Sequence, residues 1–287
     1  MLPFIAAVLL LDVWSQFAPQ TRTVRAVQTL LYGVLYLAIT CFCGVLAAYA
    51  TQRLAFPLQD QLFESVDRAL GVNWLEIIQW VDHRAMVHAI LNFAYSTMPA
   101  QIALPVVILA FSDRVSEIRK YLLGFVIALT VTTIVAALLP AVSQIAHVDR
   151  TTFDLLRFPG ATPLDHLASL RSAGPIALGG DRLGGILAFP SFHATVAVLT
   201  PLTLRFHRRL FVSLLILDAA MLCSTVTEGA HYVSDTLAGG VVAFAAYFLA
   251  KRVIGAGGHS PSAIPAVSPI AQDINGSNQA AASAMNA

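Results

Sequence analysis

Long apolar stretches separated by short polar breaks organise this chain of 287 residues. A helix needs about 20 apolar residues to cross a bilayer, so the pattern predicts six membrane-spanning helices. Their approximate limits are residues 27–50, 87–111, 121–142, 190–204, 210–226 and 231–250. The predicted fold is all-α, a polytopic membrane helical bundle with six core transmembrane helices.

The segments outside these spans predict the domain limits. Residues 1–18 are apolar but short for a span, and we expect a short extra helix there, on or across the membrane. Residues 19–254 are expected to form the core. Residues 255–287 are rich in Gly, Ser, Pro, Asn and Ala, which cannot bury enough apolar surface to fold. They predict a disordered cytoplasmic tail.

Between the first two spans, residues 51–84 combine charged side chains with apolar residues at helical spacing. Trp74 and Trp80 in this segment are typical of a membrane interface. The pattern predicts either an amphipathic helix at the interface or a loop helix packed on the bundle. It does not separate these two interpretations.

The composition indicates an integral membrane protein. Charged residues make up 11% of the chain and hydrophobic residues 57%, whereas a soluble domain carries about 25% charged residues. The net charge of +1 gives no reason to expect nucleic-acid binding. The cysteines Cys41, Cys43 and Cys223 lie in apolar runs and are interpreted as packing residues, not as a disulfide or metal framework.

The basic residues predict the orientation. If the N-terminus is cytoplasmic, ten of the seventeen Lys and Arg residues fall in short cytoplasmic connections: Arg22, Arg25, Arg114, Arg119, Lys120, Arg205, Arg208, Arg209, Lys251 and Arg252. Short basic loops stay on the cytoplasmic side. The long loop over residues 143–188 then lies on the outer face. In a bacterium, the protein would lie in the inner membrane with this face toward the periplasm.

Two short stretches on this outer face carry the candidate chemistry. One of them, residues 229–235, contains His231 and Asp235. These two residues share a helix face if the last helix has already begun at His231. A carboxylate beside a histidine fixes its tautomer and stabilises the charged ring, as a histidine nucleophile or base requires. The alternatives are a static polar contact or a metal site.

The first stretch, residues 189–193, places Ser191 and His193 at the start of the fourth span. A helix N-terminus presents free N–H groups that bind anions. A phosphate would bind there with the Ser191 hydroxyl donating to it, and His193 would protonate a leaving oxygen. The alternative for this histidine is hydrogen-bonded packing between helices.

These residues carry a family resemblance. Pro190-Ser191-Phe192-His193 resembles the Pro-Ser-x-His motif of the type 2 phosphatidic acid phosphatase superfamily, and His231-x-x-x-Asp235 resembles the end of its third motif. The longer stretches, residues 188–193 and 231–239, are similar to the inositol phosphorylceramide synthase-like branch. Sphingomyelin synthases share the His-Tyr-x-x-Asp element. The resemblance covers about residues 27–250.

The resemblance implies a metal-independent double displacement that needs no cofactor. His231 would attack phosphorus and form a phosphohistidine, with Asp235 orienting the ring. His193 would protonate the departing alcohol, and Ser191 would hold phosphate oxygens. Water or a second alcohol would then accept the phosphoryl group. The implied partners are the bilayer, a lipid phosphate or phospholipid substrate and, in a transferase, an alcohol acceptor.

The chain departs from the family pattern in its arginines. Thr225 stands where the third motif of the superfamily has a phosphate-binding Arg. The synthase-like branch also often lacks this Arg. The nearest match to the first motif, Lys-x6-Arg-Pro, is Arg150-x6-Arg157 in the long loop, and Arg171 and Arg182 are rivals. Because phosphoryl transfer needs cationic help, we expect at least one of these four to bind phosphate, with Arg182 and Arg171 favoured.

Glu228, at the outer end of the fifth span, is expected to line the site or bind an acceptor head group. The sequence thus predicts an integral membrane lipid phosphatase or phosphotransferase acting on a phospholipid or polyprenyl phosphate. One alternative is a transporter or flippase that uses the His and Asp residues as a proton relay, although no inverted repeat is obvious. Another is an inactive scaffold of the same fold.

Overall fold

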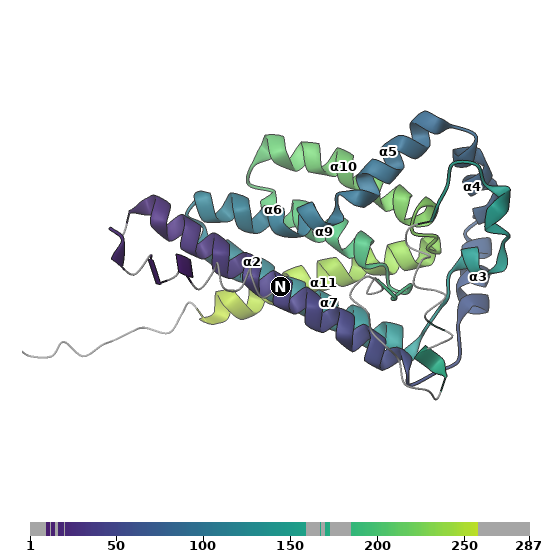
Figure 1. Cartoon of the computed structure of the whole chain (residues 1–287), viewed down its shortest axis with the longest axis horizontal. Helices are drawn as coiled ribbons and strands as arrows, with labels where there is room; N and C mark the ends of the chain where they lie inside the picture. Colours follow the sequence, from purple (N-terminus) through teal and green to yellow (C-terminus); the bar gives the residue numbers. More distant parts are fainter. Residues whose placement is uncertain are drawn as a thin grey trace, which may run out of the picture. The chain divides into compact units, whose positions relative to one another are not determined.

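The computed structural model describes residues 10, 11, 13, 14, 17–19, 21–158, 167, 170–172 and 185–257, which form helices and loops without a β-strand. Four of these helices are long and apolar enough to cross a membrane (Figure 1): α2 (Arg22–Gln52), α7 (Val115–Leu138), α10 (Arg208–Thr227) and α11 (Val233–Gly257). The predicted all-α membrane bundle is confirmed. The predicted N-terminal helix falls largely outside the described residues, as does the tail over residues 258–287.

The predicted span over residues 87–111 is two helices rather than one. α5 (Ala85–Ser96) and α6 (Met98–Phe111) meet at Thr97 with a bend of 50°. Pro99 explains the break, because it has no N–H to continue the hydrogen-bond ladder of α5. The Thr97 hydroxyl donates to the Ala94 carbonyl at 2.6 Å and closes the end of α5.

The helix α9 (Phe192–Leu204) has only 13 residues. At 1.5 Å per residue it is about 20 Å long, which is shorter than the roughly 30 Å hydrocarbon core of a bilayer. The described part of the chain therefore contains four helices that qualify as spans, or five if the bent pair counts as one. The predicted count of six is not confirmed.

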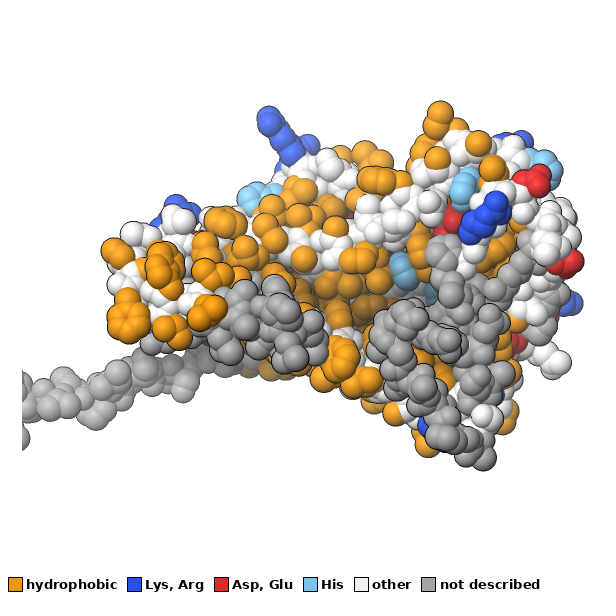
Figure 2. Space-filling view, in the orientation of Figure 1, with side chains coloured by type: hydrophobic (Ala, Val, Ile, Leu, Met, Phe, Trp, Pro, Cys, Tyr) orange, Lys and Arg blue, Asp and Glu red, His pale blue; other side chains and the backbone are white. Residues whose placement is uncertain are grey.

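α9 lies inside the bundle, against α6, α7 and α10, whereas α2 packs on α6 and α7. Val196, Ala197 and Leu199 of α9 belong to the main apolar core. Other large hydrophobic side chains remain exposed, such as Ile216 of α10 and Phe244 of α11. Figure 2 shows such side chains spread along the helices on one face. Apolar surface this extensive identifies a multi-pass membrane protein.

Residues 51–84 form two short helices, α3 (Asp60–Ala69) and α4 (Trp74–Asp82). α4 packs against α5 and α10, and the buried Trp74 indole donates to the Val226 carbonyl at 3.0 Å. The prediction that this segment is helical is confirmed. The packing of α4 on α5 and α10 agrees with the interpretation of a loop helix packed on the bundle. In the view of Figure 2, the acidic side chains gather at the end of the molecule where α3 and α4 lie.

The described beginning of the long loop contains two 3-10 helices, η1 (Gln144–His147) and η2 (Arg150–Thr152). The Asp82 carboxylate, at the end of α4, accepts hydrogen bonds from three successive backbone N–H groups at Asp154, Leu155 and Leu156. This one side chain therefore fixes the loop against α4.

Candidate active site

The two candidate stretches meet where α9 and α11 begin. The Ser191 N–H donates to the Asp235 carbonyl at 3.0 Å, and the Thr195 hydroxyl lies 3.1 Å from the Gly239 carbonyl. Gly239 allows this approach, because a Cβ built there would overlap the Ser191 carbonyl. The fold thus brings together two motifs that α9 and α10 separate along the chain.

Ser191 is the N-cap of α9. Its backbone is extended, and its hydroxyl oxygen accepts from the Ala194 N–H at 3.4 Å. Such caps satisfy one of the free donors of the first helical turn. His193 therefore lies in the first turn of α9 as predicted. The Ser191 side chain is fully buried, and its O–H can still donate to an anion.

His231 and Asp235 form a hydrogen-bonded pair, with 3.2 Å between His231 Nδ1 and Asp235 Oδ2. The same carboxylate oxygen accepts from the Tyr232 N–H at 3.0 Å, and both side chains are buried. If Nδ1 carries the proton that Asp235 accepts, Nε2 presents its lone pair to a substrate. The contact that the sequence predicted is therefore present.

The local geometry of this pair differs from the prediction. α11 begins at Val233 rather than at His231, so the histidine lies in the preceding turn and Asp235 reaches back to it. Ala230 adopts a positive φ of 54° in this turn. The His231 N–H donates to the Thr225 carbonyl at 3.1 Å, which closes the turn onto the end of α10.

The imidazole of His193 stacks on the ring of Tyr95 from α5, with 4.0 Å between centroids and 14° between planes. The same tyrosine borders Gly229, which also contacts His231. The sequence did not mark Tyr95 as a site residue, because its position depends on the bend between α5 and α6.

Carboxylates of α3 hold the turn around His231. Asp67 accepts from the N–H groups of Val233 at 2.7 Å and Ser234 at 3.0 Å, so it caps the start of α11. Asp60 accepts from the Tyr232 hydroxyl at 3.1 Å. Burial and the Asp60 carboxylate raise the pKa of the Tyr232 phenol, which keeps this donor protonated. Sequence reasoning missed these residues.

Glu228 follows the last residue of α10 and is 1% exposed. Its Oε2 lies 3.6 Å from Nε2 of His88 on α5. Its other oxygen, Oε1, has no hydrogen-bond partner among the described residues. Burial raises the pKa of this carboxyl to about 7 from its ordinary value of 4.5. The residue predicted to line the site is therefore a buried acid, one oxygen of which is unpaired among the described residues.

Within the described residues, neither Arg157 nor Arg171 forms a hydrogen bond with His193 or His231. Arg171 donates to the Phe56 carbonyl at 2.6 Å, and Arg157 donates to the Leu156 carbonyl at 3.3 Å. The backbone of Arg150 lies in η2, and Arg182 lies outside the described residues. At the position where the family's third motif has an arginine, the Thr225 hydroxyl pairs with that of Thr236 at 2.6 Å.

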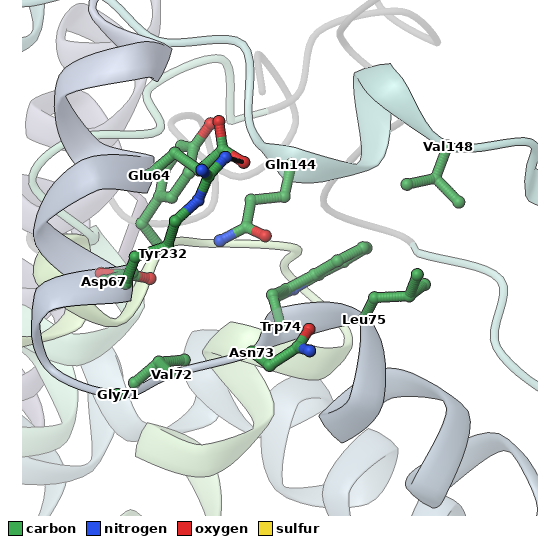
Figure 3. Close-up of a pocket in the computed structure, with 11 residues that line it drawn as sticks. Glu64, Asp67, Gly71, Val72, Asn73, Trp74, Leu75, Gln144, Val148 and Tyr232 are labelled. Carbon is green, nitrogen blue, oxygen red and sulfur yellow. Dashed lines mark hydrogen bonds and ion pairs between the residues drawn. The ribbon is translucent and has the colours of Figure 1, made fainter.

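A pocket of about 610 Å³ lies beside the site rather than in it. Figure 3 shows Glu64, Asp67 and Tyr232 on one side of this pocket, across from Trp74 and Leu75 of α4. Neither His193 nor His231 lines it. Within the described ranges, no group of three or more His, Cys, Asp and Glu side chains is placed to hold a metal ion.

Comparison with protein families gives a match to the PAP2 superfamily over residues 61–249, which contain both motifs and all of α3 except its first residue, Asp60. Neither the curated proteins nor the solved structures compared with this chain gave a match.

Proposed function

Because this chain belongs to the PAP2 superfamily, the type 2 phosphatidic acid phosphatases, we propose that it transfers a phosphoryl group from a membrane lipid through a phosphohistidine at His231. Family membership supports phosphatase or phosphotransferase activity on a phosphorylated lipid in the membrane. The observation that carries the finer proposal is the buried His231–Asp235 pair beside His193 at the N-terminus of α9.

In the first step, Nε2 of His231 attacks phosphorus and the bond to the lipid oxygen breaks. His193 donates a proton to that departing oxygen. Asp235 holds the ring through Nδ1 and stabilises the positive charge that develops on it. The Ser191 hydroxyl and the free N–H groups of the first turn of α9 bind the phosphate oxygens.

In the second step, a hydroxyl group attacks the phosphohistidine, and the electron pair of the P–N bond returns to His231. His193, neutral after the first step, accepts the hydroxyl proton. The free Oε1 of Glu228 would accept a hydrogen bond from an acceptor head group. Positive charge for the phosphate would come from Arg182 or Arg171, with Arg157 and Arg150 as rivals.

The resemblance to the inositol phosphorylceramide synthase-like branch favours an alcohol over water as acceptor. The distribution of basic residues favours the outer membrane face for both motifs, which would be the periplasmic face if the chain is bacterial. Phospholipids and polyprenyl phosphates are both candidate substrates, because each presents a phosphate at the membrane surface.

The test is turnover by the purified full-length protein in detergent with EDTA. Phosphatidic acid, an isoprenyl diphosphate, and a phospholipid with an alcohol acceptor are offered separately. His231→Ala should abolish turnover, whereas His207→Ala, on the connection between α9 and α10, should retain it. Free phosphate would indicate a phosphatase, and a new phospholipid without free phosphate would indicate a transferase.

Turnover that survives His231→Ala would refute the phosphohistidine mechanism. Absence of turnover on every substrate, with proton-coupled transport that survives the same change, would instead support the transporter interpretation.

A further inference from the structure

We propose that the buried face of α3, formed by Asp60, Phe63 and Asp67, is a positioning element that sets the catalytic stretches at residues 189–193 and 229–235 relative to each other. This inference rests on the proposed function, because it assumes that His193 and His231 act on one phosphorus atom. The face consists of the three buried residues of α3, at spacings of three and four that place them in one row.

Each member of this row contacts a catalytic stretch or the residues that continue it. Phe63 stacks on Phe189 with 4.3 Å between ring centroids, and lies 5.8 Å from the ring of Tyr232. It therefore touches the residue before the Pro-Ser-x-His motif and the residue after His231 together. Among the described residues, no other side chain makes ring-to-ring contacts with both stretches, although Tyr95 stacks on His193 and borders Gly229.

The two carboxylates fix the second stretch in orientation as well as position. Asp67 accepts the first two N–H groups of α11, and Asp60 accepts the Tyr232 hydroxyl. Asp60 also accepts from the N–H groups of Val142 and Ser143. The Ser143 hydroxyl in turn donates to the Ala230 carbonyl at 2.6 Å. The backbone on both sides of His231 is thus tied, directly or through Ser143, to α3.

The charge on Asp67 suits this role. An anionic group at a helix N-terminus is stabilised by the helix dipole, and hydrogen bonds to a charged acceptor are about twice as strong as neutral ones. Asp67 therefore defines where α11 begins. That starting point decides how far Asp235 must reach back to hold His231 at the observed 3.2 Å.

The structure supplies a matched control in Asp82. This buried carboxylate also accepts backbone N–H groups, three of them, but in the loop at residues 154–156 rather than in the catalytic stretches. Asp67→Ala and Asp82→Ala therefore remove the same chemical group, with comparable loss of hydrogen bonds. A purely structural role predicts the same effect for both.

The full-length protein in detergent is compared as wild type, Asp67→Ala, Asp67→Asn and Asp82→Ala. Because a displacement of about 1 Å at a reacting group costs about 100-fold in rate, kcat of Asp67→Ala should fall by about that factor, with little change in KM. Asp67→Asn keeps one acceptor oxygen and should fall between. Asp82→Ala should melt at least as early. Because the loop that it releases carries the candidate phosphate-binding Arg157, the comparison with this variant uses exchange at residues 229–236 and not kcat.

Hydrogen–deuterium exchange of residues 229–236 gives a readout that does not depend on activity. Exchange there should rise in Asp67→Ala and stay unchanged in Asp82→Ala. An unchanged kcat or unchanged exchange in a folded Asp67→Ala protein, or a rise in exchange of the same size in Asp82→Ala, would overturn the positioning role. Turnover by the wild-type enzyme without an acid-labile phosphoenzyme would refute the phosphohistidine step. It would leave the role of α3 open to the same test, because kcat and exchange in the variants do not depend on that intermediate.

Discussion

Two adjacent glycines in α11 allow a sharp test of the contact between the motifs. A Cβ at Gly239 would lie well inside 3.0 Å of the Ser191 carbonyl oxygen and 3.0 Å from the Ala194 Cβ. At Gly240, the nearest atom to a new Cβ is Val198 Cγ2 at 3.9 Å, an ordinary contact. Gly239→Ala should therefore push α9 away from α11, whereas Gly240→Ala should not.

The expected cost to activity exceeds the cost to stability. Relieving the overlap moves the start of α9, which carries His193, and a displacement of about 1 Å at a catalytic group costs about 100-fold in rate. That factor corresponds to about 2.7 kcal/mol in the barrier. Overpacking costs about 1–3 kcal/mol of folding free energy, and Gly→Ala in a helix returns about 1 kcal/mol. The net loss of stability for Gly239→Ala is therefore about 0–2 kcal/mol.

The assay is kcat on the best lipid substrate, together with the melting temperature in the same detergent. We expect Gly239→Ala to retain a cooperative melting transition with a kcat about 100-fold below wild type. Gly240→Ala should keep the wild-type kcat and melt at the same temperature or slightly higher. Equal activity in the two variants would show that the approach of Gly239 to Ser191 does not position the catalytic groups.

Two further predictions concern side chains beside the histidines. Burial raises the pKa of Glu228 from 4.5 to about 7, so its contribution to stability is fully present below about pH 4.5 and is lost as pH rises through about 7. The melting temperature of Glu228→Gln should fall less than that of the wild type as pH rises from about 4.5 to about 7. If the two proteins lose melting temperature in parallel over this range, the raised pKa of Glu228 is contradicted. Tyr95→Leu removes the stack on His193, a contact of about 0.5–1.5 kcal/mol, and should lower kcat by about threefold to tenfold; an unchanged kcat would show that the stack does not orient His193.

The sequence was sufficient for the features that depend on local pattern. Apolar run length predicted the helical membrane bundle, and the spacing of His231 and Asp235 predicted their contact. It was not sufficient where a single residue changes the backbone. Pro99 divides one predicted span into α5 and α6, and the α11 start at Val233 moves His231 out of the helix.

The role of α3 could not be predicted because its partners are distant along the chain. The Asp67–Val233 and Asp60–Tyr232 bonds join residues 166 and 172 positions apart, and no local pattern encodes such pairs. A weak signal exists in the row itself, since acidic residues flank Phe63 on the buried side of an amphipathic helix. Acids on the apolar face of such a helix require partners when buried.

The attachment of α3 by a single row of three side chains also determines how the protein comes apart. Its other residues are exposed, so few apolar contacts oppose its release, and segments of this kind open at lower free energy than a packed core. We therefore expect α3 to detach while α2, α7 and α9 remain packed together. Each such opening leaves the turn around His231 without its anchors. The catalytic groups are buried, yet the free energy that maintains their geometry is limited by the free energy of releasing α3.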